Sequence, residues 1–256
     1  MPFREALSSM QARVVLPTSL DTAALRQLEA SVRRQSFFSA ENLLKDVLQG
    51  TFKDIETILN PVTVERDGRP VTEGLDQATA RLRMKEALRR AGYSPDPGER
   101  GTLKDLSSDA RVNLVIETNV QMMQGAGNFI QGQSPEVLDA FPAQELVRFD
   151  QTVKQRDWKS RWLEAAVYAG DTDAARVLQE FGRMVARKDS PIWDALGSSD
   201  LFDDGLDNPY PPFAFNSGMW VQDVGFDIAE QMGLVNLNNV PQPQKLDIES
   251  LFSNAA

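Results

Sequence analysis

Residues 208–219 read NPYPPFAFNSGM, and no other stretch of the chain combines proline and aromatic residues so densely. Proline interrupts a helix and cannot donate a hydrogen bond to a sheet, so the stretch predicts neither element. Aromatic side chains at this density would promote aggregation if they were exposed. We therefore predict an ordered loop whose aromatic rings are buried. The residues assigned to this structural loop are Pro211, Pro212, Phe213 and Phe215, with Tyr210 buried beside them.

An acidic turn, Asp203-Asp204-Gly205, comes just before this loop. Its spacing invites comparison with an EF-hand calcium site, in which oxygen ligands recur along a twelve-residue loop. Phe202 and Pro211 occupy positions where that motif needs oxygen ligands. The sequence therefore predicts a plain turn and no calcium site.

The composition excludes several kinds of chemistry. The chain of 256 residues contains no Cys and no His. Disulfides, Cys-ligated zinc and iron–sulfur clusters are therefore excluded, as are thiol nucleophiles and the Ser-His-Asp arrangement. Catalysis would have to use carboxylates, Lys, Tyr or a bound hard cation. No motif places a pair of acids such as Glu117, Asp203 or Asp204 in one site, so we predict no catalytic residue, no metal and no cofactor.

The negative charge is concentrated near the end of the chain. From Ser190 onward there are ten acidic residues and one basic residue, Lys245, so this quarter carries −9 of the net −10. Such a surface would be repelled by DNA unless it faced a protein. The alternative is an acidic solvated surface that aids solubility.

Outward from the loop, the apolar spacing predicts helices over most of the chain. We expect helical structure over residues 20–59, either as one helix or as a helical hairpin around Ser36 to Ala40. A β-hairpin at 62–72 is predicted from Asp67-Gly68, a pair suited to a tight turn. Further helices are predicted at 76–91 and 107–130. The small residues Gly125-Ala126-Gly127 in the last of these favour tight packing.

The region from residue 134 to 234 alternates short helices with short strands. A short helix is predicted to begin at Ser134-Pro135 and to end before Pro142. Strands are expected at 144–149 and 184–186, and helices at 158–169, 171–182 and 226–234. The fold class predicted is therefore α+β and mainly helical. We divide the chain into an N-terminal helical arm with its hairpin (1–72), a core domain (73–235), and a linker with a C-terminal tail (236–256).

Two separated sequence elements carry a resemblance to a known family. Residues 116–121 read IETNVQ and are followed by Gly125 and Gly127, and residues 189–194 read DSPIWD before the loop at 208–219. Together they resemble the head-morphogenesis, or minor head, proteins of tailed bacteriophages, typified by the F protein of phage Mu. In that family a helix with a Thr-Asn or Thr-Glu pair and a downstream Gly precedes a variable insert. A Pro-Pro-x-His-Pro-type loop then closes the domain. The resemblance spans residues 76–234.

The resemblance implies a structural virion protein. It would be made in the bacterial host cytoplasm, then act in head morphogenesis at the portal vertex, with the portal and other head or neck proteins as partners. The family loop usually carries His and Cys, whereas this chain has Phe213, Ala214 and Gly218-Met219 there. Any metal or thiol role of the loop is therefore not expected here. A head–tail adaptor that forms a homo-oligomer on the portal ring is the alternative function.

Two other surfaces bear on partners. The helix at 76–91 is the most basic element, but Glu86 interrupts it and no aromatic residue interleaves, so DNA contact is not the favoured interpretation. No apolar run reaches membrane-spanning length, and none is expected to anchor the chain.

Residues 236–243 resemble a linker in composition. Beyond it we predict that a short apolar tail docks on another subunit as a helix, through Leu246, Ile248, Leu251 and Phe252.

Overall fold

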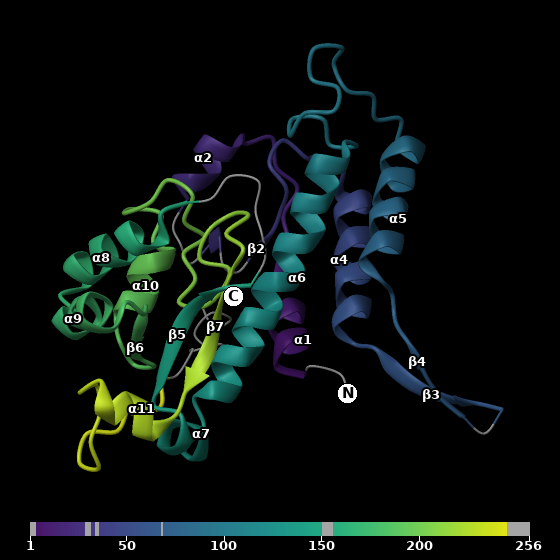
Figure 1. Ribbon diagram of the computed structural model, residues 1–256. Helices are drawn as coiled ribbons and strands as arrows, with labels where there is room; N and C mark the ends of the chain where they lie inside the picture. Colours follow the sequence, from purple (N-terminus) through teal and green to yellow (C-terminus); the bar gives the residue numbers. More distant parts are fainter. Residues whose placement is uncertain (1–3, 29–31, 34–35, 68, 150–155, 245–256) are drawn as a thin grey trace. The chain divides into compact units, whose positions relative to one another are not determined.

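The computed structural model describes residues 4–28, 32–33, 36–67, 69–149 and 156–244. Its described residues form two compact units, one reaching up to Gly127 and the other beginning at Asn128. Helices predominate and the sheets are small, so the predicted mainly helical α+β class is confirmed (Figure 1). The boundary expected between residues 72 and 73 lies inside the first unit, because the helices on either side of it share one core.

The first unit is built around three helices: α4 (Lys45–Leu59), α5 (Gln77–Arg90) and the first part of α6 (Asp109–Gly132). Each contributes a buried apolar stripe at helical spacing. Their fully buried side chains include Leu48 and Ile55 of α4, Met84 and Leu88 of α5, and Ile116 of α6. The short helix α1 (Arg4–Gln11) adds Ala6 and Met10 to this core. In α6, residues 125–127 are all buried, which confirms the predicted tight packing.

Residues 20–59 do not form the predicted helix or helical hairpin. Only α2 (Thr22–Arg26) and α4 are helices of more than one turn among the described residues of this range. Between them, β2 (Ser36–Phe37) pairs in parallel with β1 (Val14–Val15). Tertiary contacts override the helical spacing here. Phe37 is buried edge-on against Phe52, and Arg111 of α6 donates to the Ser39 hydroxyl at 2.7 Å and to the Ala40 carbonyl at 2.8 Å.

The predicted hairpin is confirmed. Strands β3 (Val62–Arg66) and β4 (Arg69–Glu73) are antiparallel, and Asp67 adopts a positive φ of 52° at the turn. Figure 1 shows the hairpin extending away from the ends of α4 and α5. Apart from Thr72, whose side chain is not described, every side chain of the two strands is exposed or partly exposed. The hairpin therefore contributes little to the core of its unit.

The second unit contains a three-stranded antiparallel sheet in the order β6-β5-β7. The central strand β5 (Ala143–Arg148) pairs with β6 (Val185–Arg187) on one side and with β7 (Met219–Val224) on the other. The helices are α7 (Pro135–Ala140), α8 (Trp158–Ala169), α9 (Thr172–Phe181), α10 (Ile192–Gly197) and α11 (Phe226–Gln231). Of these elements, β7 and α10 were not predicted.

Helix ends in this unit follow local signals in the sequence. Ser134, Asp157 and Asp171 each accept a hydrogen bond from a backbone N–H in the first turn of α7, α8 and α9. Gly170 and Gly182 end α8 and α9 with φ of 68° and 71°, a conformation that glycine adopts without strain. These caps explain why the predicted helix bounds agree closely with those observed.

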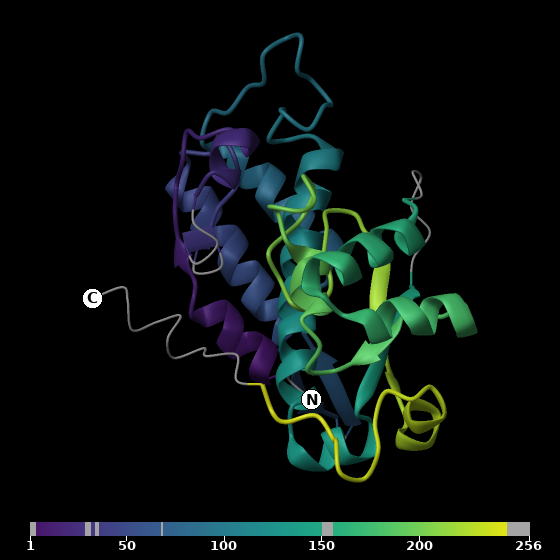
Figure 2. The same ribbon diagram turned by 90° about the vertical axis from the view of Figure 1, so that its left-hand side faces the viewer.

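The two faces of the sheet are covered differently. One face packs Leu146, Ala186 and Met219 against the indoles of Trp162 in α8 and Trp193 in α10. Figure 2 shows α8, α9 and α10 gathered on this side. On the other face, Ala143 and Val224 pack with α11 and the residues that follow it. That second cover extends over only one end of the sheet, because Val147 and Trp220 further along remain partly exposed.

Candidate functional site: a clamped proline–aromatic loop

The proline–aromatic loop has no helix or strand, yet it lies in the core of the second unit. Phe213 is fully buried, and Pro211 and Pro212, joined by a cis peptide bond, are buried as well. Tyr210 is buried beside Phe129, with ring centroids 6.0 Å apart. The predicted burial is therefore confirmed for Phe213 and Tyr210. Phe215 is of intermediate exposure and is therefore less completely buried than Phe213.

Stacked aromatic rings anchor the loop to α8 and α10. The phenyl ring of Phe213 stacks on the indole of Trp193, with centroids 6.0 Å apart and planes inclined by 25°. Trp193 in turn meets Trp162 edge-on at 5.4 Å. Both indole N–H groups are satisfied: Trp193 donates to the Arg187 carbonyl and Trp162 to the Ala174 carbonyl. Aromatic contacts of this kind add stabilisation beyond that of the buried area alone.

Two glycines allow the loop to cross the end of α10 at very short range. A Cβ on Gly197 would lie 2.1 Å from the carbonyl oxygen of Asn208. A Cβ on Gly205 would lie 2.6 Å from the carbonyl oxygen of Gly197. At this crossing the Asp207 N–H donates to the Gly197 carbonyl at 2.7 Å. Any residue larger than glycine would have to displace backbone atoms at both positions.

An arginine clamp closes the loop. We use this name for Arg156, Arg161 and Asp204. The Asp204 carboxylate receives Arg161 on one oxygen and Arg156 on the other, both at 2.6 Å. Arg161 also donates to the Leu196 carbonyl at 2.8 Å, and Arg156 to the Phe215 carbonyl at 2.6 Å. The clamp therefore ties α8 and the residues just before it to the end of α10, to Asp204 ahead of the loop and to Phe215 within the loop.

The surroundings of Arg161 show the electrostatic character of the clamp. Its guanidinium carbon lies 3.8 Å from the ring centre of Phe202 and 5.0 Å from that of Trp158. Burial lowers the pKa of Arg161 below its ordinary value, although the hydrogen bond and charge of Asp204 oppose the shift. Removing one partner would leave the other charge partly buried and uncompensated. Asp204, predicted to lie in a plain turn, is thus an anchor of the loop.

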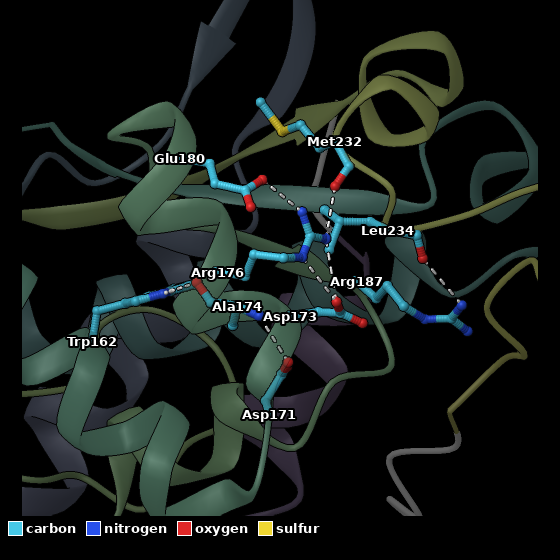
Figure 3. A network of polar contacts seen from close by, with 9 residues as sticks. All are labelled: Trp162, Asp171, Asp173, Ala174, Arg176, Glu180, Arg187, Met232 and Leu234. Atoms are coloured by element: carbon cyan, nitrogen blue, oxygen red, sulfur yellow. Dashed lines mark hydrogen bonds and ion pairs between the residues drawn. The ribbon is translucent and has the colours of Figure 1, made fainter.

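A second arginine network fixes the chain that follows α11 (Figure 3). Arg176 of α9 pairs with Asp173 and Glu180 and donates to the Met232 carbonyl at 2.9 Å. Burial lowers the pKa of Arg176, but its hydrogen bonds to the two acids outweigh burial and leave the pKa above its ordinary value. Figure 3 shows Arg176 pointing from α9 toward the Met232 carbonyl.

The predicted linker makes hydrogen bonds with its own unit. Arg187 donates to the Asn239 carbonyl at 2.9 Å, and the Gln244 N–H donates to the Gln133 side chain at 2.8 Å. Pro241 is buried. These contacts hold residues 236–243 at a few points, but most of their side chains are exposed, Leu237 at 83%, and none of them joins a core cluster, as expected for this run. The tail residues Leu246, Ile248, Leu251 and Phe252 lie outside the described part of the chain.

The carboxylates considered as catalytic candidates do not converge. Asp204 is engaged by two arginines, Asp203 is exposed on the loop, and Glu117 lies on α6 with Gln121 as its hydrogen-bond partner. Among the described residues, no three acidic side chains gather in an arrangement able to hold a metal ion. Sequence reasoning missed the part played by Arg156, Arg161 and Asp204, because no local pattern links residues more than forty positions apart.

The basic helix α5 is largely neutralised by its neighbours. Arg83 pairs with Asp54 at 2.9 Å, Lys85 pairs with Asp109, and Arg89 and Arg90 share Glu86. Cations already paired with carboxylates contribute less to phosphate binding than free ones. Throughout the described ranges, the helices are too short or too polar to span a bilayer.

Comparisons with family models, with curated proteins and with solved structures find no match for this chain.

Proposed function

We propose that this chain is a structural protein of the tailed-phage head, a minor head component that acts in head morphogenesis at the portal vertex. The observation that carries the proposal is the proline–aromatic closing element, which resembles the closing loop of the minor head family. Its two pieces, residues 189–194 and 208–219, are packed together through Trp193 and Phe213. A loop clamped this firmly suits a scaffold that must keep its shape under assembly forces.

The first sequence element of the resemblance also has a structural setting. Ile116, Thr118 and Val120 are buried on α6, so the IETNVQ stretch faces the core of the first unit. Buried residues of this kind stabilise the packing of α6. This supports a packing role for the Thr-Asn pair and adds nothing that favours a reaction.

A non-enzymatic role is part of the proposal. The chain has neither His nor Cys, and the Asp204 carboxylate, just before the loop, is occupied by two arginines. A general base needs a lone pair free to take a proton, and a carboxylate bridged by two guanidiniums is a poor one. The portal protein and other head or neck proteins are the proposed partners.

The direct test is the protein composition and density of purified virions from a phage that encodes the chain. We expect mass spectrometry to find the chain in virions at low copy number relative to the major capsid protein. We also expect a cryo-EM map to place its density at the portal vertex. Absence of the chain from intact virions would contradict the proposal.

The adaptor alternative differs in stoichiometry. The assay mixes the chain with purified portal rings and separates the complexes by sedimentation. If the chain is an adaptor, each portal ring should carry one copy of the chain per portal subunit. A minor head protein would bind at lower or variable occupancy. The Gly50→Ala variant, altered only on the exposed side of α4, serves as a folded control in the same assay.

A further inference from the structure

The strand β7 lies at one side of its sheet, and its outer edge pairs with no other strand among the described residues (Figure 1). β5 occupies the inner edge. The Phe149 N–H donates to the Gly218 carbonyl, so 149 and 218 form a hydrogen-bonded pair of the antiparallel ladder. Hydrogen-bonded and non-hydrogen-bonded pairs alternate, so the backbone N–H and C=O groups of Val221 and Asp223 point away from β5. Another strand can add to an edge of this kind.

The two outer edges of the sheet differ in how they are covered. At the β6 side, Val185 is fully buried in one cluster with Val177 of α9. At the β7 side, the side chains of Gln222 and Asp223 are exposed. The six residues of β7 contain no proline, no lysine and no bulge, which are the features that commonly prevent pairing at an edge. The β7 edge is therefore accessible to an added strand.

Apolar side chains lie beside this edge on the thinly covered face of the sheet. Val147 and Trp220 are directly opposite each other in the register, and both are partly exposed. Phe149, two residues further along β5 on the same face, is 81% exposed, and its ring centre lies 6.3 Å from that of Trp220. A strand added to β7 would place every second side chain on this face, next to Trp220. Its occupant therefore needs apolar residues at alternate positions.

The charge beside this edge is negative. β7 and α11, which follows it, carry Asp223, Asp227 and Glu230, all exposed, and no basic residue. Asp223 pairs with Lys188 at 2.7 Å but is 48% exposed, and a carboxylate can accept a second donor. From Ser190 to Gln244 there are eight acidic residues and no basic one. A basic strand complements such an edge, whereas a second copy of the chain would bring the same acids against it.

We infer that the outer edge of β7 binds an extended basic segment of a partner protein as an added antiparallel strand. Apolar side chains of that strand contact Trp220, and the Lys or Arg residues between them lie beside Asp223. The antiparallel direction continues the pattern of the sheet, in which β5 is antiparallel to both of its neighbours. This binding would take place whether or not the chain belongs to a phage head.

Short synthetic peptides serve as the probe. The first has capped ends and a fluorescent label and alternates Val and Lys over eight residues, so that its valines share one face of an extended strand. We expect fluorescence anisotropy to show saturable binding of this peptide to the full chain. Raising the salt concentration from about 0.05 to about 0.5 M should weaken binding at least about fivefold, because the attracting charges are partly exposed. A peptide with Glu in place of Lys should bind at least about tenfold more weakly.

Backbone methylation of the probe tests the strand pairing itself. In the antiparallel arrangement, the Lys residues lie opposite Val221 and Asp223 and exchange backbone hydrogen bonds with them. The backbone groups of the Val residues point away from β7. N-methylation of two Lys residues should therefore weaken binding at least about tenfold, whereas N-methylation of two Val residues should change it by no more than about twofold. The two methylated peptides have the same composition and charge, so each is the matched control of the other.

Three outcomes with the unmodified chain would overturn the inference. Absence of saturable binding would mean that the edge does not accept a basic strand. Equal binding of a peptide that has the same composition, but with its Val and Lys residues in pairs, would mean that charge alone attracts the probe. Equal losses from the two methylations, or a loss from the Val methylation alone, would mean that the probe does not pair with β7 in the antiparallel register.

Variants of the chain locate the binding site. Val221→Pro removes an N–H that points away from β5, so it should weaken binding at least about tenfold and leave the β5 ladder intact. Trp220→Thr should weaken binding at least about fivefold, because it removes the aromatic contact. Val71→Thr, on the exposed hairpin of the other unit, is the control and should leave binding unchanged. Circular dichroism checks that each variant is folded.

Unchanged binding by folded Val221→Pro and Trp220→Thr variants would place the peptide elsewhere and overturn the inference. The methylated peptides test the same pairing on the unaltered chain, so the inference stays testable if a variant does not fold. All of these measurements use only the purified chain and synthetic peptides. Their failure would therefore leave the virion test of the proposed function unaffected.

Discussion

The β3–β4 hairpin has regular structure but is exposed, whereas the proline–aromatic loop has no regular structure but is buried. The hairpin has a complete antiparallel register, yet its described side chains are exposed or partly exposed. The loop has no helix or strand, yet Phe213 and Asn208 are wholly buried. Backbone pairing alone makes a two-stranded hairpin only marginally stable in water. We therefore expect packing and side-chain hydrogen bonds to stabilise the loop more than backbone pairing stabilises the hairpin.

The comparison predicts that stability is concentrated in the irregular segment. Replacing Phe213 with Ala should lower the free energy of unfolding by about 3–5 kcal/mol, because it would leave a cavity beside Trp193 in a buried cluster. Phe215→Ala should cost clearly less, since its ring is partly exposed. Urea titration followed by tryptophan fluorescence measures both. Equal losses for the two variants would mean that Phe215 is covered as completely as Phe213.

The arginine clamp should be the next largest contribution. Arg161→Met would remove the bonds to Asp204 and Leu196 from a side chain that is 8% exposed, and we expect a loss of about 2–4 kcal/mol. Arg83→Met is the control, because its pair with Asp54 is largely solvated on the arginine side and should be worth at most about 1 kcal/mol. The same urea titration compares them. A clamp variant no more harmful than the control would show that the loop does not need the clamp.

Glycine substitutions compare a crowded backbone with an open one. Gly197→Ala would place a methyl group against the Asn208 carbonyl and should cost about 1–3 kcal/mol or more. Gly50→Ala in α4 meets nothing within 4 Å and should be neutral or stabilising by up to about 1 kcal/mol. Thermal unfolding followed by circular dichroism shows whether each substitution lowers or raises the stability of the protein. A stabilising Gly197→Ala would mean that the crossing of α10 and the loop is looser than described.

The smallest effects are expected in the hairpin. Val71 is 39% exposed, so Val71→Thr should change the free energy of unfolding by no more than about 0.5 kcal/mol. Chemical denaturation of the isolated protein is the measurement. A loss above about 1.5 kcal/mol would show that the hairpin is covered in solution, and the contrast with the loop would disappear.

Local signals predicted the elements that depend on neighbouring residues. Asp67-Gly68 predicted the hairpin, Ser134 the start of α7 and Asp171 the start of α9. Each signal works within four residues, because a cap or turn satisfies backbone groups of its own segment. Helical spacing failed for residues 36–40, where Phe52 and Arg111 from other segments contact Phe37, Ser39 and Ala40.

The sequence by itself determined that His and Cys chemistry is excluded, that helices dominate, and that the stretch around Pro211 and Pro212 is an ordered buried loop. Only the tertiary structure decided what holds that loop. Asp204 meets Arg161 across forty-three positions, and β7 pairs with β5 across more than seventy. Contacts at such separation leave no periodicity in the sequence, because they depend on how the chain folds back and not on the spacing of adjacent residues.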